Sequence, residues 1–469
     1  MPRSAGFARV NGQNAACRFT LAAIMTQSVL WISQAQFFMS LTFTLLFLLL
    51  EIGLAWALVV FKLRSVRGDA RCTQAYRFWV RVFALAFVLS FASVVPVMVQ
   101  FGSLWPALME RIGNVAGPLL AAAVFTLFLF KSCFVGAMLF GQRRLSEPAH
   151  AVLVVLVALG VTVSALWPVA LFSWMRTPAG AFFSNGQYVV IAWRDIIFNP
   201  SFPWYAALLI ALALAASSLF MLGITALQSL RRSLPDSDRM VFNGSARAAV
   251  VFLVVLAAVG VGAGRSLAQH EPARAAAAVG YWQSSHEPSV LLLTFSSPET
   301  DSGRFNWRWQ GSGGDFLARD ARNRYRGLDQ FSGMAPPGAL TFWSLRIAVL
   351  GVLITLALAA VTWWRLHARG GDPAGLPVWL RKTLVAAGFG GWCVAIAGFA
   401  HLFIGAYPYA VAGTVTLSEV LAESSFAALL AGGLGLLLVY GCCVAGFVRL
   451  LWHSVRYGVV PVARRRGRA

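Results

Sequence analysis

Nine long apolar runs follow one another along the chain, and polar, Arg-containing segments separate them. Each run has about 18 residues or more, which is enough for a helix rising ~1.5 Å per residue to cross a ~30 Å hydrocarbon core. The pattern therefore predicts an all-α polytopic membrane helix bundle of about nine transmembrane helices. The apolar runs cover residues 41–61, 82–101, 115–140, 151–172, 204–229, 246–263, 341–364, 382–404 and 425–450.

The polar segments divide the chain into five expected parts. These are an N-terminal segment (1–40), a six-helix membrane region (41–263), a long polar loop (264–340), a three-helix membrane region (341–450) and a basic tail (451–469). The long loop contains Gly/Ser clusters and several Trp, and loops of this length are functional or partly disordered. The simplest expectation is a small extramembrane cap.

The beginning of the chain does not read as a signal peptide. The first 24 residues are polar and mixed, without an apolar core before a cleavage site. Met25 is an alternative start to Met1, because the stretch after it reads as a short amphipathic approach to the first span. The sequence leaves both starts open.

Lys and Arg are distributed unequally between the two sides of the expected bundle. The short loops of one side, together with the C-terminal tail, carry 22 of them. The short loops of the other side carry three, Arg111, Arg176 and Arg194. Because cytoplasmic loops are the ones enriched in Lys and Arg, we expect the N-terminus outside, the C-terminus inside and an odd number of spans.

Composition and charge narrow the class of protein further. The chain is 59% hydrophobic and 12% charged, with a mean hydropathy of +0.71, which excludes an ordinary soluble or disordered protein. The net charge is +21, and the Arg residues that contribute most of it are clustered between the apolar runs. We therefore expect contact with anionic membrane lipid and no nucleic-acid partner. The six Cys show no zinc, redox or disulfide spacing, and no metal site is predicted.

Several motifs carry a family resemblance over about residues 28–455. They are YRFWVR (76–81), QFGSLWP (100–106), GNVAGPLL (113–120), VGAMLFG (135–141), SWMRTPAG (173–180), FNPSFP (198–203), HEPAR (270–274) and FWSLRI (342–347). With them the chain resembles subunit I of the cytochrome bd-type quinol oxidases, in particular the cyanide-insensitive, short-loop branch. The resemblance implies a respiratory-chain electron-transport protein of the bacterial inner membrane. It also implies quinol oxidation at the outer loop and oxygen reduction at heme b and heme d.

The resemblance also shows where the family's heme ligands and membrane carboxylates fall in this sequence, and none is retained. The family's His in span one corresponds to Thr44, and its acidic pair in span three corresponds to Ala123 and Lys131. Its His in span five corresponds to Leu208, its Met in span seven to Ala348, and its Glu in span eight to Phe403. We therefore expect a divergent member with degenerate heme sites, no catalytic residue and no cofactor of its own. Bulky side chains are expected to fill the heme volume, among them Phe125, Phe128 and Phe130.

A few polar residues remain as candidates for chemistry. His401 is the residual heme-ligand candidate, although a lone buried His is more often a hydrogen-bonded core residue. His270 and Arg274 of HEPAR are the quinol-loop candidates, with a structural role at the start of a loop helix as the alternative. Glu51 and Lys131 are charges inside spans, where charges are usually paired or functional. They could pair with each other, or Lys131 could face a partner subunit or water.

The leading hypothesis is a heme-free or heme-poor structural or assembly subunit, a pseudoenzyme within a cytochrome bd-type ubiquinol oxidase complex. A second membrane subunit, either a ligand-complete subunit I or a subunit II, would then carry the hemes. One alternative is an active oxidase subunit with relocated ligands, using His401, His270 or a partner's cofactors. The other alternative is a quinone-binding or transport-like membrane module.

The Lys/Arg bias predicts the side of the membrane on which each fusion reporter functions. A reporter fused after Ala469 is expected in the cytoplasm, and one inserted near Ser312 in the periplasm. Side-specific enzymes, β-galactosidase for the cytoplasm and alkaline phosphatase for the periplasm, provide the measurement. A periplasmic signal from the C-terminal fusion would overturn the nine-span topology.

Overall fold

The computed structural model describes residues 4–141, 144–294, 306–368, 370–422 and 424–457. The side chains of residues 4–26 and 131–132 lie outside this description. Within the described residues, nine helical segments are long and apolar enough to cross a membrane. The predicted all-α bundle of nine membrane-length helices is therefore confirmed.

The membrane-length helices extend beyond the apolar runs that predicted them. They are α1 (Ser4–Val66), α2 (Ala70–Leu104), α3 (Pro106–Leu127) continued by the π-helix η1 (Phe128–Val135) and by α4 (Gly136–Phe140), α5 (Glu147–Arg176), α7 (Phe202–Ser229), α8 (Asp236–His270), α10 (Gly338–Ala368), α11 (Val378–Ala387) followed by α12 (Gly390–Ile404), and α13 (Phe426–Tyr457).

The first span differs most from its prediction. Its membrane-length part begins at Gln27 rather than near residue 41, and α1 continues through the expected N-terminal segment. The apolar run stops short because the intervening stretch contains polar residues. Several of these are buried against neighbouring helices, namely Ser33, Gln34, Gln36 and Ser40.

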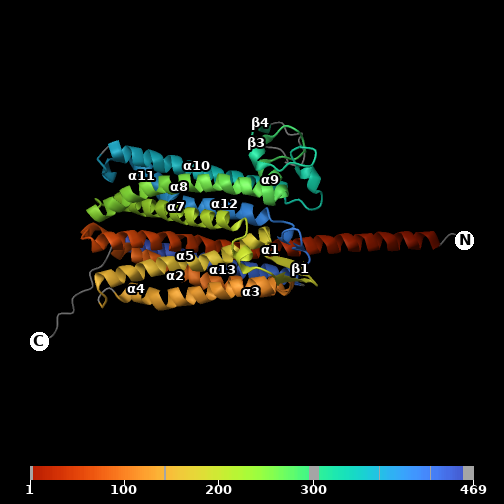
Figure 1. The fold of residues 1–469 in the computed structure, drawn as a ribbon, viewed down its shortest axis with the longest axis horizontal. Helices are drawn as coiled ribbons and strands as arrows, with labels where there is room; N and C mark the ends of the chain where they lie inside the picture. The colour runs from red at the N-terminus through yellow and green to blue at the C-terminus, as the bar shows by residue number, and fades with distance from the viewer. Residues whose placement is uncertain (1–3, 142–143, 295–305, 369, 423, 458–469) are drawn as a thin grey trace.

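The helices run side by side, with α1 in the middle of the bundle (Figure 1). This helix packs against α2, α5, α7, α12 and α13. Most of its residues between Phe47 and Leu58 are buried, as expected for a helix surrounded by others. Gly53 of α1 allows a close approach to α7, since a Cβ there would lie 2.2 Å from the Ser217 Oγ. Helix α1 begins beyond one end of the bundle and α13 ends at the other (Figure 1), as an odd number of crossings requires.

The long polar loop folds into a cap over one end of the bundle. The cap contains α9 (Pro272–Val279), β3 (Ser289–Thr294), β4 (Asn306–Gln310), η3 (Gly314–Phe316) and η4 (Leu328–Phe331). Strands β3 and β4 pair antiparallel, with Ser289 opposite Gln310. The cap has a small core of its own, formed by Ala276, Val279, Tyr281, Leu317 and Tyr325.

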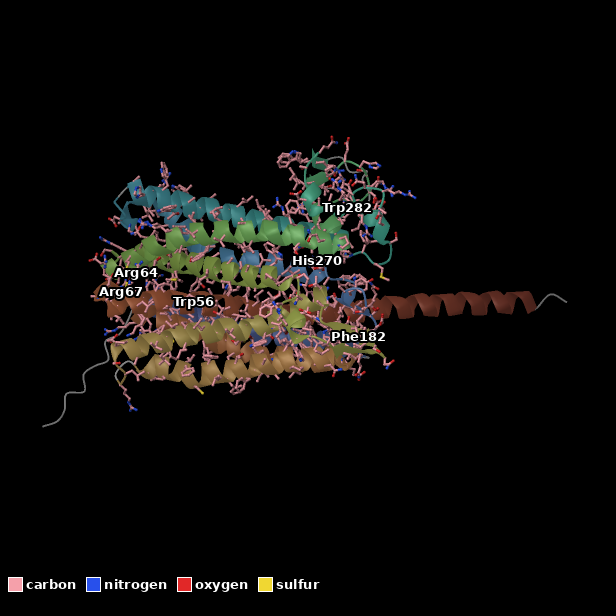
Figure 2. The ribbon with its side chains drawn as sticks, viewed as in Figure 1. Trp56, Arg64, Arg67, Phe182, His270 and Trp282 are labelled. Atoms are coloured by element: carbon pink, nitrogen blue, oxygen red, sulfur yellow. The ribbon has the colours of Figure 1, made fainter. Side chains whose placement is uncertain are left out.

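Two further hairpins and short helices complete the loops. They are β1 (Ala181–Ser184) with β2 (Gln187–Val190), α6 (Trp193–Ile197), η5 (Pro373–Gly375), and β5 (Tyr409–Val411) with β6 (Val415–Thr416). Arg64 and Arg67 lie at the end of the bundle opposite His270 and Trp282 (Figure 2). The bundle thus has a cap end and a basic end, whose assignment to the outer and inner sides of the membrane stays a prediction.

Candidate functional site

Asn199, from the FNPSFP motif, organises the loop between α5 and α7 at the cap end. It is almost fully buried. Its Nδ2 donates to the Ser173 Oγ at 2.9 Å and to the Ile196 carbonyl at 3.0 Å. Its Oδ1 accepts bonds from the Thr177 hydroxyl and from the main-chain N–H groups of Ser201 and Phe202. The side chain thus joins the end of α5 to the start of α7.

Arg176, from the SWMRTPAG motif, ties α5 to the hairpin β5–β6. The residue is 3% exposed. Its guanidinium donates to the main-chain carbonyls of Ala406, Tyr409 and Ala410. A buried cation is tolerated only when hydrogen bonds replace its hydration, so the retained Arg and the path of the hairpin depend on each other.

Arg346, from the FWSLRI motif, holds the cap onto α10. Its guanidinium donates to the carbonyls of Ala278 and Val279 at the end of α9, and to that of Leu291 in β3. It also lies 3.9 Å from the centroid of the Phe342 ring. The carbonyls that end a helix lack partners within it, and Arg346 satisfies them.

Arg274, one of the two quinol-loop candidates, is buried beneath the cap. Its guanidinium donates to the Glu271 carboxylate at 3.1 Å and to the Tyr205 hydroxyl at 3.2 Å. Burial alone would lower the pKa of Arg274, but Tyr205 and Glu271 outweigh it and raise that pKa. The side chain also packs against Gly405, where a Cβ would lie 2.8 Å from the Arg274 Cδ.

His270, the other quinol-loop candidate, is exposed. Its Nδ1 lies 2.9 Å from the Ser266 carbonyl oxygen. The residue lines a pocket of about 360 Å³ together with Arg176, Pro200 and Gly413. Three of the retained motifs therefore meet at this pocket, whereas Arg274 does not line it.

The positions that the sequence analysis predicts to correspond to family heme ligands carry side chains that pack or bond internally. The Thr44 hydroxyl donates to the carbonyls of Ser40 at 3.0 Å and Ser93 at 3.2 Å. Ala123 and Ala348 are buried, and Leu208 packs at the edge of the cluster between α7, α8, α10 and α12. The methyl and isobutyl groups have no lone pair to offer an iron atom.

Phe403 belongs to an aromatic cluster in the cap-end half of the bundle. Its ring centroid lies 5.5 Å from that of Phe38 and 6.3 Å from that of Phe37, both on α1. Phe399 stacks on Phe38 at 5.4 Å and also contacts Phe172 of α5. These separations are typical of favourable aromatic pairs.

The expectation for the phenylalanines of span three is wrong for two of the three. Phe125 and Phe128 are 66% and 55% exposed, so they lie on the surface of the bundle and fill no interior volume. Only Phe130 points inward, against α5, where a Cβ on Gly160 would lie 2.2 Å from the Phe130 Cβ. The buried apolar side chains at the cap end come mainly from α1, α2, α3 and α5 and from the loops beside them.

His401 is buried on α12. Its Nδ1 lies 3.1 Å from the Thr341 carbonyl oxygen on α10. With the proton on Nδ1, the ring donates to that carbonyl and keeps the Nε2 lone pair. This is the geometry of a hydrogen-bonded core histidine, and it is also how heme and metal ligands are oriented. Among the described residues, no group of three or more His, Cys, Asp or Glu side chains could hold a metal ion.

The two charges predicted inside spans are placed only in part. Glu51 is fully buried in α1, and Lys131 lies in η1 with its side chain outside the described residues. Their pairing stays a prediction. The structure also contains an ion pair that the sequence analysis did not predict. Lys62 of α1, which is buried, binds Glu147 at the start of α5. The centroid of the Tyr76 ring lies 5.9 Å from the Lys62 Nζ.

A capped bundle of membrane-length helices defines a multi-pass integral membrane protein, with its candidate pocket at the cap end. Residues 32–459 match the family described as cytochrome bd terminal oxidase subunit I, and the chain belongs to that family. The resemblance seen in the sequence is thereby confirmed.

Individual relatives agree with this assignment. The chain is 25% identical to the cytochrome bd ubiquinol oxidase subunit 1 of Bacillus subtilis, over 90% of this chain and 93% of the relative. It is 28% identical to the cytochrome bd-II ubiquinol oxidase subunit 1 of Escherichia coli, over 59% of this chain and 54% of the relative. The fold matches a bd oxidase structure from Geobacillus thermodenitrificans with a TM-score of 0.83 and 22% identity, covering 92% of this chain and 100% of that one.

Replacing Asn199 tests the structural role of the retained motifs. Asn199→Ala leaves several buried donors and acceptors without partners, so we expect a loss of about 2–3 kcal/mol of stability. Asn114→Ala is the matched control, because Asn114 is exposed and makes one bond, to the Tyr188 carbonyl. Its expected loss is below about 1 kcal/mol. Thermal unfolding in mild detergent measures both, and equal effects would contradict the role of Asn199.

Proposed function

We propose that this chain is a structural, heme-free or heme-poor subunit of a cytochrome bd-type quinol:oxygen oxidoreductase complex in a bacterial inner membrane. The observation that supports it is a contrast between two sets of positions. Asn199, Arg176 and Arg346, from motifs shared with the family, make dense hydrogen bonds that hold the cap end together. The ligand positions inside the bundle carry apolar or internally bonded side chains.

The residues at those positions do not fit axial ligation of heme as the family implies it. Phe403 lies among Phe37, Phe38 and Phe399, and Leu208 packs against apolar neighbours. The Thr44 hydroxyl proton is engaged with main-chain carbonyls. A heme placed here would have to displace packed side chains, which protein interiors resist. The proposal therefore assigns no catalytic step to this chain.

The cofactor content of the subunit purified alone tests this part of the proposal. We expect little Soret absorbance, no reduced heme d band, and a pyridine hemochrome value well below one heme per chain. A value of about one or more would contradict the heme-free reading and favour the active-oxidase alternative.

In that event His401→Ala should remove the heme, because His401 is the ligand candidate inside the bundle. His286→Ala, in the exposed cap, is the matched control and should leave the heme content unchanged.

The proposal also requires a partner. The relatives are named as subunit 1 of an oxidase, a name that implies at least one further subunit. The helices expose broad apolar faces: in an apolar 18-residue stretch of α13 only 11% of the residues are buried, against 72% in that of α7. Lipid and a second bundle can both cover such faces, since packing drives helix association in membranes.

Affinity purification from mild detergent tests the partner. A heme-carrying membrane subunit, either a ligand-complete subunit I or a subunit II, is expected to copurify in about equal amount. Deletion of this chain is expected to impair assembly of that oxidase. Recovery of a lone monomer or simple homodimer, with oxidase assembly unchanged by the deletion, would refute the structural-subunit proposal.

The pocket at the cap end favours a second candidate function, a quinone-binding module. It is lined by His270 and Arg176, which can donate hydrogen bonds to a quinone carbonyl. If it binds quinone, decylubiquinone should raise the unfolding temperature, and His270→Ala should reduce that rise while His286→Ala preserves it. No rise in the unmodified protein would exclude this candidate.

A further inference from the structure

An apolar groove at the basic end of the bundle lies far from the cap. It runs between α7, α11 and α13 and has a volume of about 190 Å³. The first two helices meet tightly, since a Cβ on Gly223 would lie 2.6 Å from the Gly388 Cα. In contrast, α13 touches α7 only sparsely. This unequal packing leaves a groove whose walls include Leu227, Val385 and Leu451.

A cation lies at the mouth of the groove. Trp452 lines the groove, and the Arg231 guanidinium lies 3.9 Å from the centroid of its ring. Arg231 is exposed, and within the described ranges no acidic side chain forms an ion pair with it. Arg381 lies at the same end and donates to the Ser229 carbonyl at 2.8 Å, while its buried Nε has no hydrogen-bond partner.

We propose that this groove binds one acyl chain of an anionic phospholipid, whose phosphate is held by Arg231, at the end of the bundle that also carries Arg381. Its size excludes a transmembrane helix, which is about 10 Å across with its side chains. Apart from the indole N–H of Trp452, the side chains of the walls offer no hydrogen-bond donor to a quinone ring. A guanidinium group without an acidic partner, lying beside a Trp, is instead the chemistry of a membrane interface that attracts anionic headgroups.

The full chain, purified with its complex in mild detergent, allows a direct test. Phosphatidylglycerol or phosphatidylcholine with the same acyl chains is added, and native mass spectrometry counts the lipids retained. We expect selective retention of phosphatidylglycerol. Arg231→Gln should weaken it about fivefold, as expected for one cation near an anionic lipid.

Two further variants separate the groove from general charge. Arg365→Gln is the matched control, because Arg365 also lies near a Trp ring at the basic end, 5.8 Å from that of Trp379, but does not line the groove. It should leave retention unchanged. Leu227→Trp should fill the groove and abolish retention with the arginines intact.

Three results would overturn the proposal. They are equal retention of the two lipids, equal loss with Arg365→Gln and Arg231→Gln, and a quinone or protein displaced by Leu227→Trp in place of the lipid. Because Arg231 is exposed, its replacement decides the matter even if the tryptophan variant fails to fold. The result is independent of heme content, so this proposal and the proposed function can fail separately.

Discussion

Guanidinium groups that are buried or half-buried at the cap end must find hydrogen-bond acceptors, and the path of the surrounding loops depends on how they do so. Arg176 and Arg346 use main-chain carbonyls of β5, β3 and α9, whereas Arg274 uses Glu271 and Tyr205. Removing hydration from a cation costs several kcal/mol unless such bonds replace it. The arginines and the loop ends therefore satisfy each other, and loss of either would leave the other unpaired.

Much of the membrane bundle could be predicted from the sequence, because hydrophobic length alone identifies a span. The start of the first span could not, since Gln34 and Gln36 are polar yet buried. A hydropathy pattern cannot distinguish polar residues that face a neighbouring helix from those that face water. The hairpin β3–β4 could not be predicted either, because the sequence of its Trp-containing strand resembles that of a polar loop rich in aromatic residues.

The candidate site was predicted less well, for a related reason. The motifs indicated which segments the chain shares with the family, but they could not show that Asn199 and Arg176 bind main-chain atoms of other segments. The orientation of the Phe125 and Phe128 side chains was predicted wrongly, because the sequence of a single apolar helix does not show which of its faces packs against neighbouring helices. Phe38 and Phe399 stack although they lie far apart in the chain, and no local signal announces such a pair.

The π-helix η1 interrupts span three at residues 128–135. In a π-helix the main-chain bonds reach five residues along instead of four, so each wide turn delays the rotation of the side chains that follow. Residues beyond Val135 consequently point in directions that ordinary α-helical counting does not give. Ala123 and Lys131 stand on either side of the start of this stretch. The eight-residue spacing between them therefore cannot be converted into a shared or separate helical face by ordinary α-helical counting.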